Sequence, residues 1–126
     1  MANISIDKLA SEVVKAVAEY NEDVSRSIDK AVDDAANDML RDTQANAPKN
    51  TGDYSKGFKK TNRDSMGTTR RIIWNKKYSR IVHLLEFGHA KVGGGRVAGK
   101  PHLRLAYDRI EPQMMEKIRQ IIRNGG

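Results

Sequence analysis

The first 47 residues contain neither glycine nor proline, and their apolar side chains recur at steps of three and four residues. This spacing places them on one stripe of an α-helix. Unbroken to about Ala45, the helix would be roughly 60 Å long, at about 1.5 Å per residue. Because that length is unusual for a small domain, we expect a helical half over residues 1–47, broken near residues 21–23. The stripe consists of Ile6, Leu9, Val13, Val17, Tyr20, Val24, Ile28, Ala31, Ala35 and Met39.

The apolar period changes after this helical half. Residues 48–75 open with a turn-rich segment that contains Pro48 and Gly52. Two segments with the character of strands follow, at about 54–62 and 68–75, and the residues between them suit a hairpin connection. The sequence therefore predicts a small antiparallel sheet after the first helix.

The last part of the chain returns to helical spacing. Residues 78–88 predict a short helix that ends at a glycine. Residues 89–100 hold four glycines and no apolar period, which predicts a flexible basic loop. Residues 101–124 predict a second long amphipathic helix, which Pro112 must kink or restart. The fold class is thus α+β in a single domain over residues 1–126, with a small antiparallel sheet flanked by long N-terminal and C-terminal helices.

The charge of the chain is unevenly distributed. The net charge is +7, but residues 1–50 hold 6 Lys and Arg against 10 Asp and Glu, whereas residues 51–126 hold 17 against 6. A subunit with opposite charge in its two halves can dock head-to-tail on copies of itself, since complementary fields steer association. The basic half could equally face nucleic acid. Both interpretations remain open.

Basic residues of the second half, together with one carboxylate, are candidates for contacts with another subunit or with DNA. Glu86 lies between Leu85 and Phe87, where it is either an exposed position or a buried group in an ion pair, with Arg104 or with another subunit. Trp74, Tyr78 and Tyr107 could stack on bases, although aromatic residues at such positions are more often part of a core. The contact candidates are Arg70, Arg71, Glu86, Lys91, Arg96, Lys100 and Arg104.

Enzymatic interpretations find little support in the sequence. There is no cysteine, and the carboxylates of the basic half are few and scattered. Residues 94–100 have the spacing of a phosphate-binding loop, but Pro101 stands where that chemistry needs a hydroxyl. His83, Glu86 and His89 would lack a suitable common face for a metal ion. We expect no catalytic residue, no cofactor, no metal site and no small-molecule substrate.

The sequence also bears on where the protein is found. Its N-terminus shows no basic region followed by an apolar run, so no secretory signal is expected. No apolar stretch approaches the roughly 20 residues that span a bilayer. We therefore expect a soluble protein that is made in a cytoplasm and does not contact a membrane.

Three segments together resemble one family. Residues 47–52, after the long helix, resemble the turn A-P-x-x-T-G, and residues 78–88 resemble the block Y-A-x-x-x-E-F-G-T. Residues 100–106 resemble R-P-F-L-R-P-A, which opens a final helix. This order resembles the gene-product-ten family of long-tailed lambdoid bacteriophages, known as neck, head–tail joining or tail-completion proteins. His102 stands where that family usually has phenylalanine, and Tyr54 where leucine is common.

The resemblance implies a small structural subunit that assembles into a ring at the phage neck. Its partners would be its own copies, the connector or stopper proteins on one side and tail proteins on the other, with DNA passing through the lumen. It would be located in the virion, and in the host cytoplasm during assembly. A small basic DNA-binding module is the alternative, and a metal-dependent enzyme is the weakest interpretation.

Overall fold

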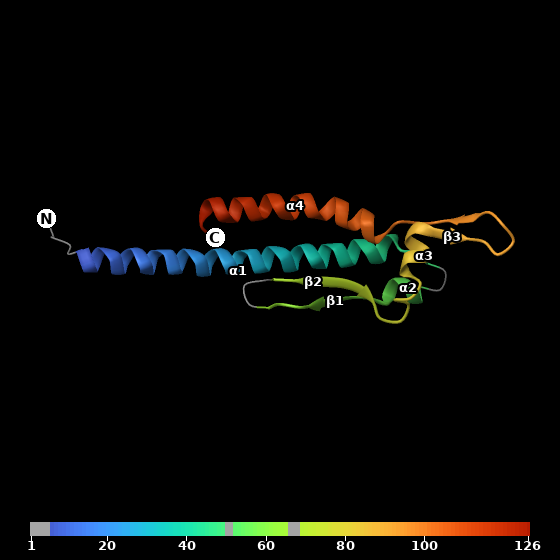
Figure 1. Ribbon diagram of the computed structural model, residues 1–126, viewed down its shortest axis with the longest axis horizontal. Coiled ribbons are helices and arrows are strands. Elements are labelled where there is room, and N and C mark those ends of the chain that lie inside the picture. Colours follow the sequence, from blue (N-terminus) through green and yellow to red (C-terminus); the bar gives the residue numbers. More distant parts are fainter. Residues whose placement is uncertain (1–5, 50–51, 66–68) are drawn as a thin grey trace.

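A computed structural model describes residues 6–49, 52–65 and 69–126. Figure 1 shows an elongated molecule in which α4 lies along one side of α1 and the β1–β2 hairpin along the other. The expected α+β class, with long terminal helices and antiparallel pairing, is confirmed. In chain order the elements are α1 (Ile6–Asn46), α2 (Asp53–Lys56), β1 (Phe58–Asn62), β2 (Arg71–Asn75), α3 (Val82–Phe87), β3 (Gly88–Ala90), β4 (Arg96–Ala98) and α4 (Leu103–Asn124).

Helix α1 is continuous, so the expected break near residues 21–23 is wrong. Without glycine or proline the backbone has no reason to interrupt its hydrogen bonds there. Glu22 pairs with Arg26 one turn later, at 2.9 Å, although both side chains are exposed and the pair contributes little. The Tyr20 hydroxyl donates a hydrogen bond of 2.8 Å to the carbonyl of Ile122. The end of α4 thus supports α1 just before the expected break.

Helix α4 runs antiparallel to α1 and packs on it through small side chains. Ala31 and Ala36 of α1 and Ala106 of α4 are buried, which lets the two backbones approach closely. Helix α4 continues through Pro112 without restarting. Because Pro112 has no N–H, the carbonyl of Asp108 loses its usual helical partner. Both residues are exposed, so water can bind this carbonyl.

The β1–β2 hairpin is shorter than expected. Residues 53–56 form the helical turn α2 instead of the start of a strand, because Gly52 adopts a left-handed φ of 86° and redirects the chain. Strand β1 then pairs with β2 from Phe58 opposite Asn75 to Asn62 opposite Arg71. The expected connection lies partly outside the described residues, since residues 66–68 are not described.

The segment expected as a flexible basic loop, residues 89–100, contains most of a second hairpin, so it is not a loop throughout. Strands β3 and β4 pair antiparallel, with Gly88 opposite Ala98. Glycines permit this pairing, because a Cβ on Gly88 would lie 2.3 Å from the carbonyl oxygen of Val97. The preceding helix α3 begins at Val82 instead of Tyr78, since Tyr78 and Ile81 form a hydrogen-bonded turn before it.

The main apolar cluster lies where α1, α2 and β1 meet. Ala47, Tyr54 and Phe58 form its buried centre. Of the three aromatic residues for which a core position was favoured, two are instead exposed: Trp74 by 39% and Tyr107 by 54%. Half-buried residues that pack against the cluster are Leu40, Ile73, Tyr78, Val82, Leu85 and Leu103.

Gly99 provides a test of the second hairpin. An added Cβ would lie 2.5 Å from the Gly88 nitrogen and 2.6 Å from the Glu86 oxygen, so Gly99→Ala should lower the free energy of unfolding by about 2 kcal/mol, as overpacking does. Gly93→Ala, in the same hairpin, meets nothing within 4 Å and should change it by less than about 0.5 kcal/mol. Urea unfolding measures both variants, and equal stability would contradict this packing.

Candidate functional site

The start of α4 is held by a carboxylate from another element. The Glu86 side chain of α3 is buried, and its Oε1 accepts hydrogen bonds from the backbone N–H groups of His102 (2.9 Å) and Leu103 (3.0 Å). Its Oε2 accepts one from the Arg104 N–H at 3.0 Å. The capping residue His102 makes no side-chain cap of its own. Glu86 therefore satisfies the free amides of α4 and complements the positive end of its dipole.

His102 is fully buried beside this carboxylate. Its Nδ1 lies 2.7 Å from the Lys100 carbonyl and 3.0 Å from Glu86 Oε1. Both of these atoms accept hydrogen bonds, so Nδ1 carries a proton. In the neutral ring Nε2 then accepts from the Tyr54 hydroxyl, at 2.6 Å. The ring also meets Phe58 edge-on, with centroids 5.6 Å apart. A histidine where the resembled family has phenylalanine thus keeps an aromatic contact and adds polar ones.

Tyr54 extends this buried network towards the β1–β2 hairpin. Its carbonyl accepts a hydrogen bond of 2.7 Å from the Asn75 amide, and the Asn75 oxygen accepts one of 2.9 Å from the Tyr78 N–H. Burial, followed by the charge of Glu86, raises the pKa of the Tyr54 hydroxyl to about 12. Since Tyr54, Glu86 and His102 are each at most 8% exposed, a substrate cannot reach them. The network joins α2, β2, α3 and α4 and has a structural role.

Of the two expectations for Glu86, the exposed position is wrong and the buried position is confirmed. The ion pair with Arg104 is wrong, because Glu86 binds the backbone of Arg104 instead of its guanidinium. The Arg104 side chain is exposed and lies 3.7 Å from Asp108. The hydrogen-bonding groups that attract Glu86 belong to the main chain at a helix start, and residue types alone do not display them.

The three residues considered for a metal differ in environment. Glu86 is buried, whereas His83 and His89 are exposed. Within residues 6–49, 52–65 and 69–126, no group of three or more His, Cys, Asp or Glu is arranged to hold a metal ion. The Glu86 oxygens already bind the amides of α4.

Arg70 and Arg71 are neighbours in sequence but have different environments. The Arg71 side chain is only 10% exposed, and it pairs with Asp33 of α1 at 2.9 Å and with Asp64. Asp33 also binds Lys60 at 2.7 Å, and these two cations hold the pKa of Asp33 below its ordinary value, Lys60 having the larger effect. Arg71 therefore fastens the hairpin to α1. Of this pair, only the exposed Arg70 remains a contact candidate.

Lys91, Arg96 and Lys100 are exposed on or beside the β3–β4 hairpin, at the end of the molecule opposite the N-terminus. The guanidinium of Arg96, the first residue of β4, donates a hydrogen bond of 3.0 Å to the carbonyl of Phe87, the last residue of α3. The structure thus presents the expected basic surface, but on a paired hairpin. It brings these three residues to the same end as Arg104.

A second basic cluster was missed by sequence reasoning. Four lysines, with Asp53 and Gly57, line a surface hollow beside α2 and the β1–β2 hairpin. Strand pairing brings them together, because Phe58 lies opposite Asn75 and Lys59 opposite Trp74. The two pairs of consecutive lysines, at residues 59–60 and 76–77, could have indicated this cluster only with the strand register known. The lysines are Lys56, Lys59, Lys76 and Lys77.

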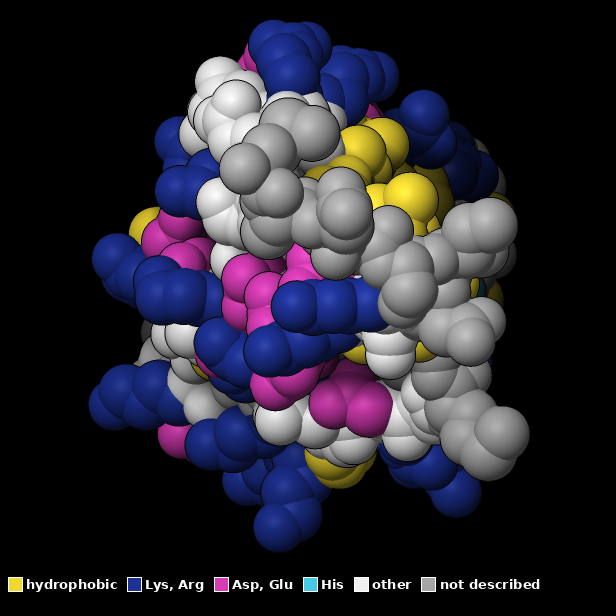
Figure 2. Space-filling model, turned by 90° about the vertical axis from the view of Figure 1, so that its left-hand side faces the viewer, with side chains coloured by type: hydrophobic (Ala, Val, Ile, Leu, Met, Phe, Trp, Pro, Cys, Tyr) yellow, Lys and Arg dark blue, Asp and Glu magenta, His cyan; other side chains and the backbone are white. Residues whose placement is uncertain are grey.

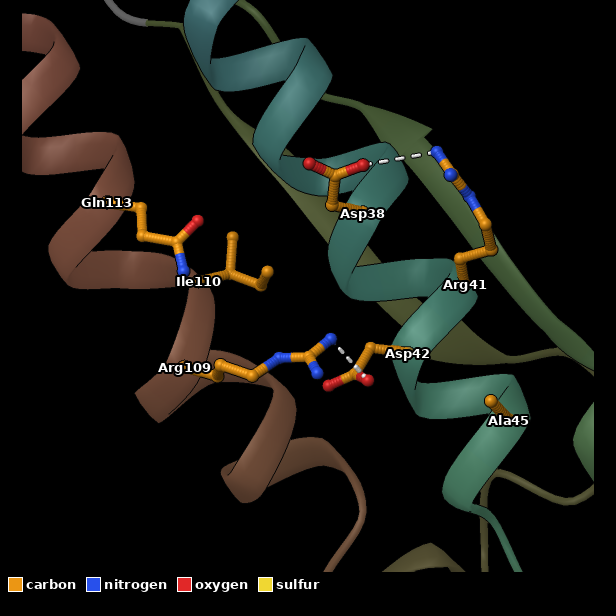
Figure 3. A pocket seen from close by; sticks show the side chains of 7 residues that line it. All are labelled: Asp38, Arg41, Asp42, Ala45, Arg109, Ile110 and Gln113. Atoms are coloured by element: carbon orange, nitrogen blue, oxygen red, sulfur yellow. Dashed lines mark hydrogen bonds and ion pairs between the residues drawn. The ribbon is translucent and has the colours of Figure 1, made fainter.

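A hollow between α1 and α4 is bridged by an ion pair and not organised around a catalytic group. Figure 3 shows Arg109 of α4 reaching towards Asp42 of α1, and Arg41 beside Asp38. The Asp42 side chain is only 11% exposed. The pair with Arg109 thus ties the two helices together, and Ala45, Ile110 and Gln113 complete the lining.

The N-terminal end of α1 leaves its apolar stripe uncovered. Leu9, Val13 and Val17 are 54%, 54% and 53% exposed, although a side chain on such a stripe normally packs against a partner. In Figure 1 this part of α1 extends past the end of α4. Figure 2 views the molecule from this end, and the described residues there show acidic and basic side chains next to one another. The β3–β4 hairpin, with its exposed basic side chains, lies at the other end of the molecule (Figure 1).

The buried polar groups of this α+β chain hold its own elements together, whereas apolar and basic side chains are exposed on its surface. Such exposed surfaces are suited to contacts with other molecules. The model of the family described as "Bacteriophage HK97-gp10, putative tail-component" matches residues 7–88. The chain belongs to this family, which confirms the resemblance, and it is a structural component of the phage particle. The first two resembling blocks lie within the matched residues, and residues 100–106 lie beyond them.

A search of curated proteins and a search of solved structures found no match. Among the described residues, no helix is both long and apolar enough to cross a membrane.

Replacing Glu86 tests the cap of α4. Glu86→Gln keeps the shape of the side chain but removes its charge and directs an N–H₂ group at backbone donors. The free energy of unfolding should fall by about 2 kcal/mol at neutral pH, the range for hydrogen bonds to a charged group. Glu116→Gln, on the exposed side of α4, should change it by less than about 0.5 kcal/mol. Equal effects in urea unfolding would contradict the cap.

Glu86→Gln should also change how the stability of the protein depends on pH. Burial raises the pKa of Glu86, but the hydrogen bonds from the amides of α4, together with the positive charge that His102 carries when protonated, outweigh burial and hold this pKa below the ordinary 4.5. The unfolded chain therefore binds this proton first, so the stabilisation is complete above about pH 4.5 and is lost as the pH falls through the folded pKa. Unfolding midpoints between neutral pH and pH 3 should fall less steeply in Glu86→Gln; parallel curves would contradict this assignment.

Proposed function

We propose that the protein is a subunit of the junction between phage head and tail, where it assembles with its own copies into a ring. Membership of a phage tail-component family supports a structural role in the virion. The three sequence blocks that resemble neck and tail-completion proteins support the position at the neck. The connector or stopper proteins and the tail proteins would be its neighbours on the two sides. It would act without catalysis, in particles assembled in the host cytoplasm.

The observation that carries this proposal is the uncovered apolar stripe at the N-terminal end of α1. Leu9, Val13 and Val17 follow one another at intervals of one helical turn and are each more than half exposed. Large apolar side chains that remain grouped on a surface usually mark a site of contact with another protein. A subunit that is complete only when covered by a neighbour suits an assembly built from repeated copies.

Joining of heads and tails provides the test. In a phage that encodes this protein, deletion of its gene should leave DNA-filled heads and finished tails separate, and adding the purified protein to that extract should restore joined, infectious particles. Electron microscopy and plaque counts measure the result. Heads and tails that still join after the deletion would contradict a role at the junction.

The ring is tested separately by light scattering on the purified protein across concentration and salt. A single discrete mass equal to several subunits is expected at high concentration. A broad distribution of sizes that grows with concentration would contradict a closed ring, because open head-to-tail contacts produce filaments.

A small basic DNA-binding module is the second candidate, and the basic end of the molecule favours it. The lysine hollow and the β3–β4 hairpin bring many cations to that end, where the Glu86 carboxylate is buried. This candidate predicts tight DNA binding by a monomer or dimer, with the logarithm of affinity falling by about 0.9 per phosphate contact for each tenfold rise in salt. A fluorescence titration with duplex DNA measures this slope. Weak binding that Lys59→Gln and Lys76→Gln leave unchanged would exclude it.

A further inference from the structure

The exposed stripe belongs to a projecting segment with two distinct faces. This segment, residues 6–19, is called the arm; it extends along α1 beyond the contact of Tyr20 with the end of α4. Leu9, Val13 and Val17 lie on one face of the arm. At 100° per residue, Lys15 and Glu19 lie on the other side of the helix, about 160° and about 120° from Val13, whereas Glu12 lies at the flank of the apolar face. The arm is thus an amphipathic helix whose apolar side is left exposed by the described residues of its own chain.

The same chain carries an apolar groove between α4 and β2, with α1 as its floor. Tyr107, at one wall, is 54% exposed. Arg70 and Arg71 lie along the β2 side, and Arg70 is exposed. The apolar lining comes mainly from Val32, Met39, Ile73, Tyr107, Ile110 and Met114.

The groove and the arm have similar lengths. Two helical stretches run along the groove, from Val32 to Met39 and from Tyr107 to Met114, and each rises about 10.5 Å at 1.5 Å per residue. The apolar face of the arm, from Leu9 to Val17, rises about 12 Å on the same basis. A helix with apolar side chains one turn apart can therefore lie along the groove over most of its uncovered face.

We propose that the arm of one copy lies in the groove of the next copy, so that the subunits join head-to-tail. This inference rests on the proposed ring and names the contact that would form it. The contact is heterologous, with different surfaces on the two partners. Repetition of such a contact around a rotation axis closes a ring, whereas a symmetric contact stops at a dimer.

Charge favours a second copy seated in this way over two arms packed on each other. The arm, residues 6–19, holds three acidic residues against two basic ones. Two arms side by side would therefore bring a small excess of like charge together, which disfavours a symmetric pair. Two walls of the groove, α4 and β2, come from residues 51–126, which carry the excess of positive charge, and Arg70 lies exposed at the rim. Opposite fields thus steer the arm towards the groove of another copy.

Cross-linking between two variants tests this contact, because the chain has no cysteine of its own. Val13→Cys marks the centre of the arm and Tyr107→Cys marks the groove. When the two purified variants are mixed with a short thiol-specific cross-linker, a mixed dimer should form in at least tenfold higher yield than either variant forms alone. Lys15→Cys, on the opposite face of the arm, is the matched control and should link poorly to Tyr107→Cys.

The outcomes separate the possible arrangements. Val13→Cys that links efficiently to itself would show a symmetric pairing of arms and overturn the proposal. Equal yields with Lys15→Cys, or no linkage at concentrations where the wild type forms oligomers, would also overturn it. A wild type that stays monomeric and unlinked at every accessible concentration would overturn it as well.

A second pair of variants distinguishes this inference from the proposed function. Val13→Gln with Val17→Gln removes the apolar face of the arm, and should raise the concentration needed for assembly at least tenfold with an unchanged circular dichroism spectrum. Lys15→Gln with Glu19→Gln changes the same number of residues on the other side of the arm, leaves the net charge unchanged and should assemble like the wild type. If the valine variant still forms rings and joins heads to tails, the arm contact is wrong while the role at the junction stands.

Discussion

Three backbone N–H groups at the start of α4 converge on the buried carboxylate of Glu86, and the arrangement of the molecule depends on that contact. It places the first turn of α4 against α3, beside the apolar cluster formed by Tyr54 and Phe58. From this origin α4 runs back along α1 until the carbonyl of Ile122 meets Tyr20. The starting point and length of α4 thus determine how much of α1 is covered.

A small core and an open surface go together in this protein. Among the described residues, most of the buried apolar ones are alanines, including Ala31, Ala36 and Ala106, which allow close helix packing but each contribute little buried area. Polar contacts, such as Arg71 with Asp33 and Tyr54 with His102, align the elements around them. Larger apolar side chains remain on the arm and beside the groove. The isolated subunit therefore keeps apolar surface that an assembly can bury, which agrees with a component of a phage particle.

Much of the fold could be predicted from local patterns. Periodicity identified both long helices, and three sequence blocks identified the family. Two errors were local: the break expected in α1 had no glycine or proline to cause it, and the left-handed φ of Gly52 directs a short helix before β1. The pairing of β3 with β4 depends on glycines on both sides of the turn, Gly88 and Gly99, which allow close approach. Glu86 was recognised as unusual, but its partners are main-chain amides that exist only once α4 has formed.

The sequence by itself determined the helical halves, the charge imbalance and the absence of thiol chemistry, because these follow from residue type and spacing. Only the tertiary structure decided which of these residues are available to partners. In the folded chain Arg71 forms an ion pair with Asp33, Lys59 and Lys76 line the same hollow, and Val13 is exposed. The physical reason is that periodicity marks which face of a helix is apolar, whereas burial depends on where a second element begins and ends. In this protein α4 ends before it reaches the arm.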